Sequence, residues 1–191
     1  MLSGLPHALR PFMKAHPRVE LELIVGVSEA LRDQMEAGKL DLIVLKRRPG
    51  ETHGRMVWRD SLIWAASRDF RLDPDRPLPL VILAPPALTR AIAFAALEEH
   101  GCRWQIICSS YSQSGIHAAV SAGLGIAPHA KSLLPSQLVV FQDKRLPPLG
   151  ETEFILLSRR GAPNGSIQAL SDILMNGGIL KPINQTWMSA S

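Results

Sequence analysis

Residues 109–128 read SSYSQSGIHAAVSAGLGIAP, a stretch that predicts the end of a strand, a helix and the start of another strand. Gly123 and Gly125 stand where the helix must stop, and a short apolar step leads on to Pro128. A dinucleotide-binding fingerprint is excluded, because its glycines follow a strand and open a helix. The glycines instead predict a helix C-cap and a tight turn into the next strand.

The hydroxyl side chains of residues 109–114 allow two interpretations. In the simpler one, Ser112 only caps the helix, which is worth about 1 kcal/mol. In the functional one, the helix start binds an anion, because its first N–H groups are free and carry the positive end of the helix dipole. Ser28, expected to cap an earlier helix, and Thr89 also stand at helix starts that follow strands. Since ligands bind at that edge of open α/β sheets, the three helix starts favour a ligand cleft.

The first 68 residues alternate between helical and extended patterns. An amphipathic helix is expected over 5–16, with a kink or a short first turn at Pro11. The alternation over 19–25 predicts a strand with one polar face, and a helix then runs from Ser28 to a turn at Gly38. The apolar run 40–45 predicts a buried strand. This order favours an α/β subdomain with a parallel sheet, whose first part we place at residues 1–68.

The second half of the chain changes composition twice. The charged, proline-bearing stretch 67–79 predicts a linker, and so does 142–151. Strands and helices between them predict a second subdomain over 80–141. The strand and helix over 151–176 are too small for a domain, so we expect them to return to the first subdomain. Residues 177–191 are predicted to form a flexible tail.

Bulk properties describe an ordinary globular chain. Hydrophobic residues make up 46% and charged residues 20% of its 191 residues. The net charge of +4 favours a solvated basic surface over a DNA-binding stripe, because the densest cluster is only Lys46–Arg48. No apolar run reaches the ~18 residues of a membrane span, and the first residues do not form a secretory signal. Cys102 and Cys108 give no disulfide framework, which favours the cytoplasm.

Motifs for catalysis and metal binding are missing from the sequence. The six histidines show no zinc spacing with a nearby carboxylate, so solvated or half-buried roles are expected for them. No serine sits in a G-x-S-x-G elbow, and no two carboxylates are placed for acid–base work near the glycine turns. We therefore expect neither an enzyme nor a metal site nor a cofactor.

An ordered series of motifs identifies the chain with one family. LPHALRPFMKAHPRVELELIVGVSEALRDQMEAGKLDLIVL, residues 5–45, resembles the first half of the effector-binding domain of LysR-type transcriptional regulators. WRDSLIWAAS (58–67) resembles the family's next strand, and HAAVSAGLGIAP (117–128) its second-subdomain helix and turn. FILLSRRGAPNGSIQALSDIL (154–174) resembles its return to the first subdomain. The resemblance spans residues 5–174.

The resemblance implies a fold and a function. The fold is α/β, with two Rossmann-like subdomains joined by two crossovers, similar to type 2 periplasmic binding proteins. A small molecule, often anionic and here expected to be a carboxylate, binds between the subdomains of such regulators. Matching positions imply these effector-binding residues: Ser28, Lys46, Pro86, Thr89, Ser110 and Ser112. The family also implies a homodimer, for which the helix 88–97 and the first helix with residues 19–25 are our candidate surfaces.

The chain departs from the family pattern in two places. The N-terminal DNA-binding domain and its linker helix are absent, so DNA would be bound only through a domain outside this chain. The first strand of subdomain one is also missing, because Met1–Gly4 is too short for it. We expect the exposed edge to lower stability or to pair with another chain. Two alternatives stay open, a solute-binding protein of the same fold and an enzyme on that fold.

Overall fold

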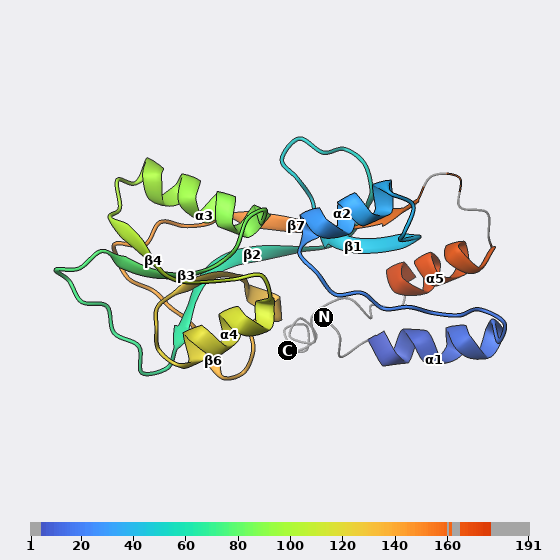
Figure 1. Cartoon of the computed structure of the whole chain (residues 1–191), viewed down its shortest axis with the longest axis horizontal. Helices are drawn as coiled ribbons and strands as arrows, with labels where there is room; N and C mark the ends of the chain where they lie inside the picture. Colours follow the sequence, from blue (N-terminus) through green and yellow to red (C-terminus); the bar gives the residue numbers. More distant parts are fainter. Residues whose placement is uncertain (1–4, 160, 162–164, 177–191) are drawn as a thin grey trace, which may run out of the picture. The chain divides into compact units, whose positions relative to one another are not determined.

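The computed structural model describes residues 5–159, 161 and 165–176 (Figure 1). The predicted tail, 177–191, lies outside the described residues. The chain forms two compact units: unit 1 comprises Met1–Arg59 and Glu153–Ser191, and unit 2 comprises Asp60–Thr152. The chain passes from one unit to the other within strands β2 (Arg55–Ser67) and β7 (Glu151–Ser158). The domain limits placed from the sequence at 1–68, 80–141 and 151–176 stay a prediction.

Unit 1 is built around strand β1 (Leu42–Lys46), which pairs with β7 from Leu42↔Ser158 to Lys46↔Phe154. Helix α2 (Ser28–Glu36) packs on β1, and α1 (Leu5–Ala15) lies beside α5 (Gly165–Asn176), as Figure 1 shows. Apolar side chains of α2, β1 and β7 form one core cluster: Leu31, Ile43, Leu45 and Ile155, flanked by Met35, Leu40 and Leu157. This cluster holds the start of α2 against the end of β1.

One expectation for unit 1 was wrong. β1 and β7 are antiparallel rather than parallel, because β7 brings the chain back from unit 2 against the direction of β1. Helix α1 spans Leu5–Ala15 with Pro11 inside it, and the kink expected at Pro11 stays a prediction. The cost of the missing N–H bond is offset by the burial of Ala8 and Phe12 on the inner face of α1.

The strand predicted over residues 19–25 is also absent from the structure. These residues are irregular, and Leu23 and Val25 are 58% and 78% exposed. A strand needs a neighbour whose backbone closes its hydrogen bonds. Within the described residues β1 pairs with β7, and no strand pairs with residues 19–25. Alternating hydrophobicity alone therefore does not make a strand here.

Unit 2 contains a parallel pair of strands, as the α/β pattern predicts. Strand β3 (Leu78–Leu83) pairs in parallel with β4 (Trp104–Ser110). Strands β5 (Ala127–Ala130) and β6 (Leu138–Val140) pair antiparallel with β2, and a 3₁₀ turn, η2, spans Lys131–Leu133. Helices α3 (Leu88–Glu99) and α4 (Gln113–Ser121) complete the unit.

The glycine turn behind α4 has the predicted form. Gly123 adopts a left-handed φ of +75° and donates its N–H to the carbonyl of Val120 at 2.9 Å, which ends the helix. Gly125 has a different role. A Cβ on Gly125 would lie 2.3 Å from the carbonyl oxygen of Pro79, so only glycine fits there. This close approach lets Ile126 donate to that same carbonyl at 2.9 Å.

Candidate functional site

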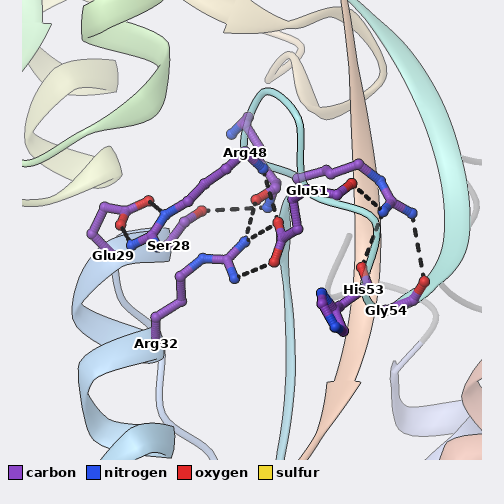
Figure 2. A network of polar contacts seen from close by, with 9 residues as sticks. Ser28, Glu29, Arg32, Arg48, Glu51, His53 and Gly54 are labelled. Atoms are coloured by element: carbon purple, nitrogen blue, oxygen red, sulfur yellow. Dashed lines mark hydrogen bonds and ion pairs between the residues drawn. The ribbon is translucent and has the colours of Figure 1, made fainter.

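Ser28 joins the start of α2 to the end of β1 (Figure 2). Its Oγ accepts the backbone N–H of Lys46 at 3.4 Å. The expectation that Ser28 caps α2 was wrong, since the N-cap is Val27 and no side chain caps that helix. Ser28 is instead the first residue of the helix, so its hydroxyl is available to the neighbouring strand. The contact brings two sequence-predicted site residues together.

Arg32 lies one turn after Ser28 in α2 and contacts the same junction. Its two terminal nitrogens bind the two carboxylate oxygens of Glu51, each at 2.7 Å, and one also donates to the Lys46 carbonyl at 3.2 Å. The Arg32 and Glu51 side chains are 7% and 15% exposed. A guanidinium that binds both oxygens of one carboxylate fixes the relative orientation of the two side chains as well as the distance between them. Arg32 therefore ties α2, the end of β1 and the 47–54 loop into one body.

Two further arginines shape the 47–54 loop. Arg47 donates to the carbonyl oxygens of Glu51 at 2.9 Å and His53 at 3.0 Å, and its Nε lies 2.7 Å from a Glu153 carboxylate oxygen. Arg48 forms an ion pair with Glu29 at the start of α2. The loop is therefore held by side-chain contacts at both ends.

The charges of this junction are strongly coupled. The hydrogen bond from Arg48 lowers the pKa of Glu29. Burial alone favours protonated Glu51, but the Arg32 hydrogen bond and the Arg48 amide outweigh it and lower the pKa of that carboxyl. Both glutamates are therefore ionised at neutral pH. Each of three arginines at the junction pairs with one carboxylate: Arg32 with Glu51, Arg47 with Glu153, and Arg48 with Glu29.

Lys46 and the helix start supply groups for an anion. The Lys46 ammonium lies 5.0 Å from the centre of the Phe154 ring, which stacks on Trp58 at 3.9 Å. The first intrahelical bond of α2 runs from the Leu31 N–H to Val27, so the amides of residues 28–30 precede it. The Ser28 hydroxyl and the amides of the helix start lie beside the Lys46 backbone, and free amides at a helix start can bind a small anion.

In unit 2, a cluster of serine hydroxyls surrounds the start of α4. Ser112 is the N-cap, as predicted, and its Oγ accepts the Gly115 N–H at 3.1 Å. Ser110 Oγ accepts the Ser112 N–H at 3.2 Å, and Ser114 Oγ lies 3.2 Å from Ser112 Oγ. A Cβ on Gly115 would lie 2.3 Å from Ser110 Oγ, so glycine allows the hydroxyls to crowd there.

Pro86 and Thr89 sit differently at the start of α3. Pro86 is exposed, whereas Thr89 is only 7% exposed, and Ala87 is the N-cap without a side-chain cap bond. The structure thus makes the Thr89 hydroxyl a buried group of unit 2 rather than an open helix start. Arg90 was not foreseen: it donates to the Leu83 carbonyl at 3.1 Å.

Sequence reasoning missed Arg32 and Glu51, the strongest contacts of the junction. Arg32 follows Ser28 by four positions, so the helical period already places both on one face of α2. No local pattern marks Glu51, because its partner lies 19 residues away.

Other site chemistries find little support in the described part of the chain. There, no three or more His, Cys, Asp or Glu side chains are grouped to hold a metal ion. Cys102 and Cys108 are both free thiols. Among the described helices, none is long and apolar enough to cross a membrane.

The family model of the LysR substrate binding domain matches residues 2–177. The chain belongs to this family. The curated relatives include the HTH-type transcriptional regulators PecT of Dickeya dadantii (strain 3937), 25% identical over 174 residues, and DgdR of Burkholderia cepacia, 27% identical over 169. These matches cover 91% and 88% of this chain but 55% and 58% of the relatives, so the chain spans little more than half their length.

Solved LysR-type domains share the fold. The CcmR regulatory domain of Synechocystis PCC6803, in complex with 2-PG, aligns with a TM-score of 0.72 at 20% identity, covering 95% of this chain and 92% of that one. The effector binding domain of QuiR with shikimate aligns at 0.69 and 15% identity, covering 91% and 90%. The α/β fold of the type 2 periplasmic-binding-protein kind, expected from the resemblance, is confirmed.

Proposed function

We propose that this LysR substrate-binding domain senses a small anionic metabolite through the junction of α2, β1 and the 47–54 loop. One observation carries the proposal: the Ser28 hydroxyl is bonded to the Lys46 backbone, which fixes a helix start and a lysine side chain at one place in unit 1. Two structural relatives are complexes with small molecules, 2-PG and shikimate. A carboxylate or phosphate fits a helix start, which carries the positive end of the helix dipole.

The cluster of serine hydroxyls at the start of α4 is the second part of the proposal. Ser110 and Ser112 surround the start of α4, where the positive end of the helix dipole favours an anion. Pro86 precedes α3 at an exposed position, whereas burial of Thr89 makes that residue a weaker candidate. The binding roles of Ser110, Ser112 and Pro86 therefore remain predictions.

Binding, without turnover, is the proposed activity. A ligand that prefers one of two states shifts their populations by its difference in affinity, which is sufficient for signalling. The relatives are longer HTH-type regulators, of which the matches cover 55% and 58%, so we infer that DNA binding belongs to a part of the whole protein outside this chain. As a regulator of transcription it would act in the cytoplasm.

Replacing Lys46 with methionine should weaken binding of the effector at least tenfold, because a charged hydrogen bond contributes about 1.5–3 kcal/mol. A thermal-shift screen of small carboxylates and phosphate esters, with shikimate and 2-PG among them, first selects the ligand. At about 100 times its dissociation constant a ligand adds about 2.7 kcal/mol of stability. Titration calorimetry then compares the wild type with Lys46→Met.

Lys14→Met provides the matched control, since Lys14 is exposed in the last turn of α1 and lies outside the junction. It should bind as the wild type does. Equal affinities of the Lys46→Met and Lys14→Met variants, or a panel without a single ligand, would argue against the proposal.

We also propose that the chain forms a homodimer through residues 19–25. Leu23 and Val25 are 58% and 78% exposed there, an unusual pair of apolar side chains for a monomer surface. Light scattering after size exclusion should give twice the chain mass, and Val25→Lys should shift it toward the single-chain mass. A monomer at high concentration would exclude the dimer.

A further inference from the structure

A buried histidine in unit 2 is held with one ring nitrogen pointed at a second histidine. His129, in β5, is only 4% exposed. Its Nδ1 lies 2.8 Å from the carbonyl oxygen of Ala130, an acceptor, so Nδ1 carries the proton. In the neutral ring Nε2 then presents a lone pair. Metal-binding histidines are oriented in this way, with the other ring N–H donated to a carbonyl or carboxylate.

The second histidine comes from α4. His117 Nε2 lies 2.9 Å from His129 Nε2. The side-chain amide of Gln113, one turn earlier on the same helix, lies 3.1 Å from the same His117 nitrogen. Desolvation by burial lowers the pKa of the His117 ring. Two imidazoles and one amide therefore converge from two elements of unit 2.

We propose that His117 and His129 are ligands of a divalent transition-metal ion that favours imidazole, namely Cu²⁺, Ni²⁺ or Zn²⁺. Gln113 supplies its amide oxygen as a third ligand once that group turns, and water completes the coordination. With metal–nitrogen bonds of about 2.0–2.1 Å, two ligands lie about 2.9 Å apart at a right angle and about 3.3 Å apart in a tetrahedron. The observed 2.9 Å matches the first separation and is about 0.4 Å shorter than the second, and the rings turn so that both lone pairs meet at the ion.

Metal binding at this site changes which nitrogen of His117 carries the proton. Without metal, one ring nitrogen donates a proton to the other, and His117 is the donor because His129 Nδ1 is already protonated. The Gln113 amide then faces the same His117 N–H with its oxygen, which accepts. On metal binding, His117 Nε2 gives that proton to solvent and His117 Nδ1 takes one up. Each ring then carries its proton on Nδ1, and each Nε2 lone pair binds the ion. Acid protonates these lone pairs, so metal affinity falls at low pH.

His100 offers a matched comparison within the same unit. Its Nδ1 also lies near a backbone carbonyl, that of Ala96 at 3.0 Å, at the end of α3. His117 and His129 bring two imidazole rings together, with ring centres 5.1 Å apart. His100 shares the carbonyl contact, but its position at the end of α3 gives it no such pairing with a second imidazole among the described residues.

Calorimetry of the full chain with NiCl₂, CuCl₂ and ZnCl₂ after chelator treatment tests the proposal. We expect one ion per chain for at least one metal, with affinity lowered at least tenfold by His117→Ala and changed less than twofold by His100→Ala. Circular dichroism checks that the His117→Ala variant folds. Equal binding by the wild type and the His117→Ala variant, or no stoichiometric binding, would overturn the site.

A gain of affinity provides a second test that does not remove a ligand. Gln113 is exposed at the start of α4, so Gln113→Glu exchanges the amide oxygen for a carboxylate oxygen without disturbing a packed group. The charged ligand should tighten binding at least threefold. An unchanged or weaker affinity in this variant would contradict the assignment, even if His117→Ala failed to fold.

Discussion

Replacing Arg32 with methionine should lower the free energy of unfolding by about 3–5 kcal/mol, the usual cost of breaking a buried ion pair. The substitution removes the fork that binds both Glu51 oxygens at 2.7 Å and leaves that carboxylate, 15% exposed, without its partner. It also frees the Lys46 carbonyl, which Arg32 binds at 3.2 Å. Urea unfolding followed by circular dichroism measures the loss.

Two variants distinguish the stability lost by breaking the ion pair from the stability lost by removing any arginine. Arg10→Met makes the same change at an exposed position of α1 and should stay within about 0.5 kcal/mol of the wild type. Arg32→Met combined with Glu51→Leu should regain much of the loss, because no unpaired charge remains. Equal losses in the Arg10→Met and Arg32→Met variants would contradict the role given to this pair.

The acid dependence gives a second readout of the same variant. The pKa of Glu51 is lowered in the folded chain from its ordinary value of 4.5, so its contribution to stability is present above that value. That contribution disappears as the pH falls from about 4.5 through the lower folded pKa. Arg32→Met removes the partner that lowers the pKa, so its stability should fall less steeply over this interval. An unchanged slope would show that Glu51 titrates independently of Arg32.

Gly125→Ala should cost about 3 kcal/mol, the upper end for an overpacked site. The new Cβ would lie 2.3 Å from the Pro79 carbonyl oxygen, and this oxygen belongs to backbone that cannot rotate away. Moving it also strains the bonds that join Ile126 to Pro79 at 2.9 Å and to Val81 at 2.8 Å. Thermal and urea unfolding of the variant measure the cost.

Gly165→Ala is the matched control for this prediction. Gly165 opens α5 without a left-handed φ, and a Cβ at this position would meet no other group of the described residues within 4 Å. The substitution should be neutral or stabilise by up to about 1 kcal/mol, since alanine loses less entropy on folding. Similar losses in both variants would indicate a general intolerance of side chains rather than the contact with Pro79.

The sequence predicted local structure well wherever hydrophobic pattern and end signals agreed. Helix α3 begins at Leu88 and α4 is capped by Ser112, both as expected. Residues 19–25 alternate in hydrophobicity as a strand does, but they do not form a strand. A strand must pair with a neighbouring strand, and that neighbour can lie far along the chain. The antiparallel pairing of β1 with β7 depends likewise on the return of the chain from unit 2.

The candidate site was predictable only in part, for the same reason. Ser28 was found from its place at a helix start and Lys46 from the family resemblance, yet their mutual contact spans 18 residues. Thr89 shared the helix-start pattern but is buried, since sequence position does not reveal which face of α3 is covered. His117 and His129 stood 12 residues apart with no metal spacing, and only the packing of α4 near β5 brings them together.

Backbone amide NMR during titration with the ligand selected by the thermal-shift screen tests the central claim most directly. The account predicts saturable shifts at Ser28, Glu29, Ala30 and Lys46, whose amides border the proposed anion position. Lys46→Met should abolish these shifts at the same ligand concentration. Saturable binding that leaves the four amides unchanged in the wild type would contradict an anion site at the α2–β1 junction.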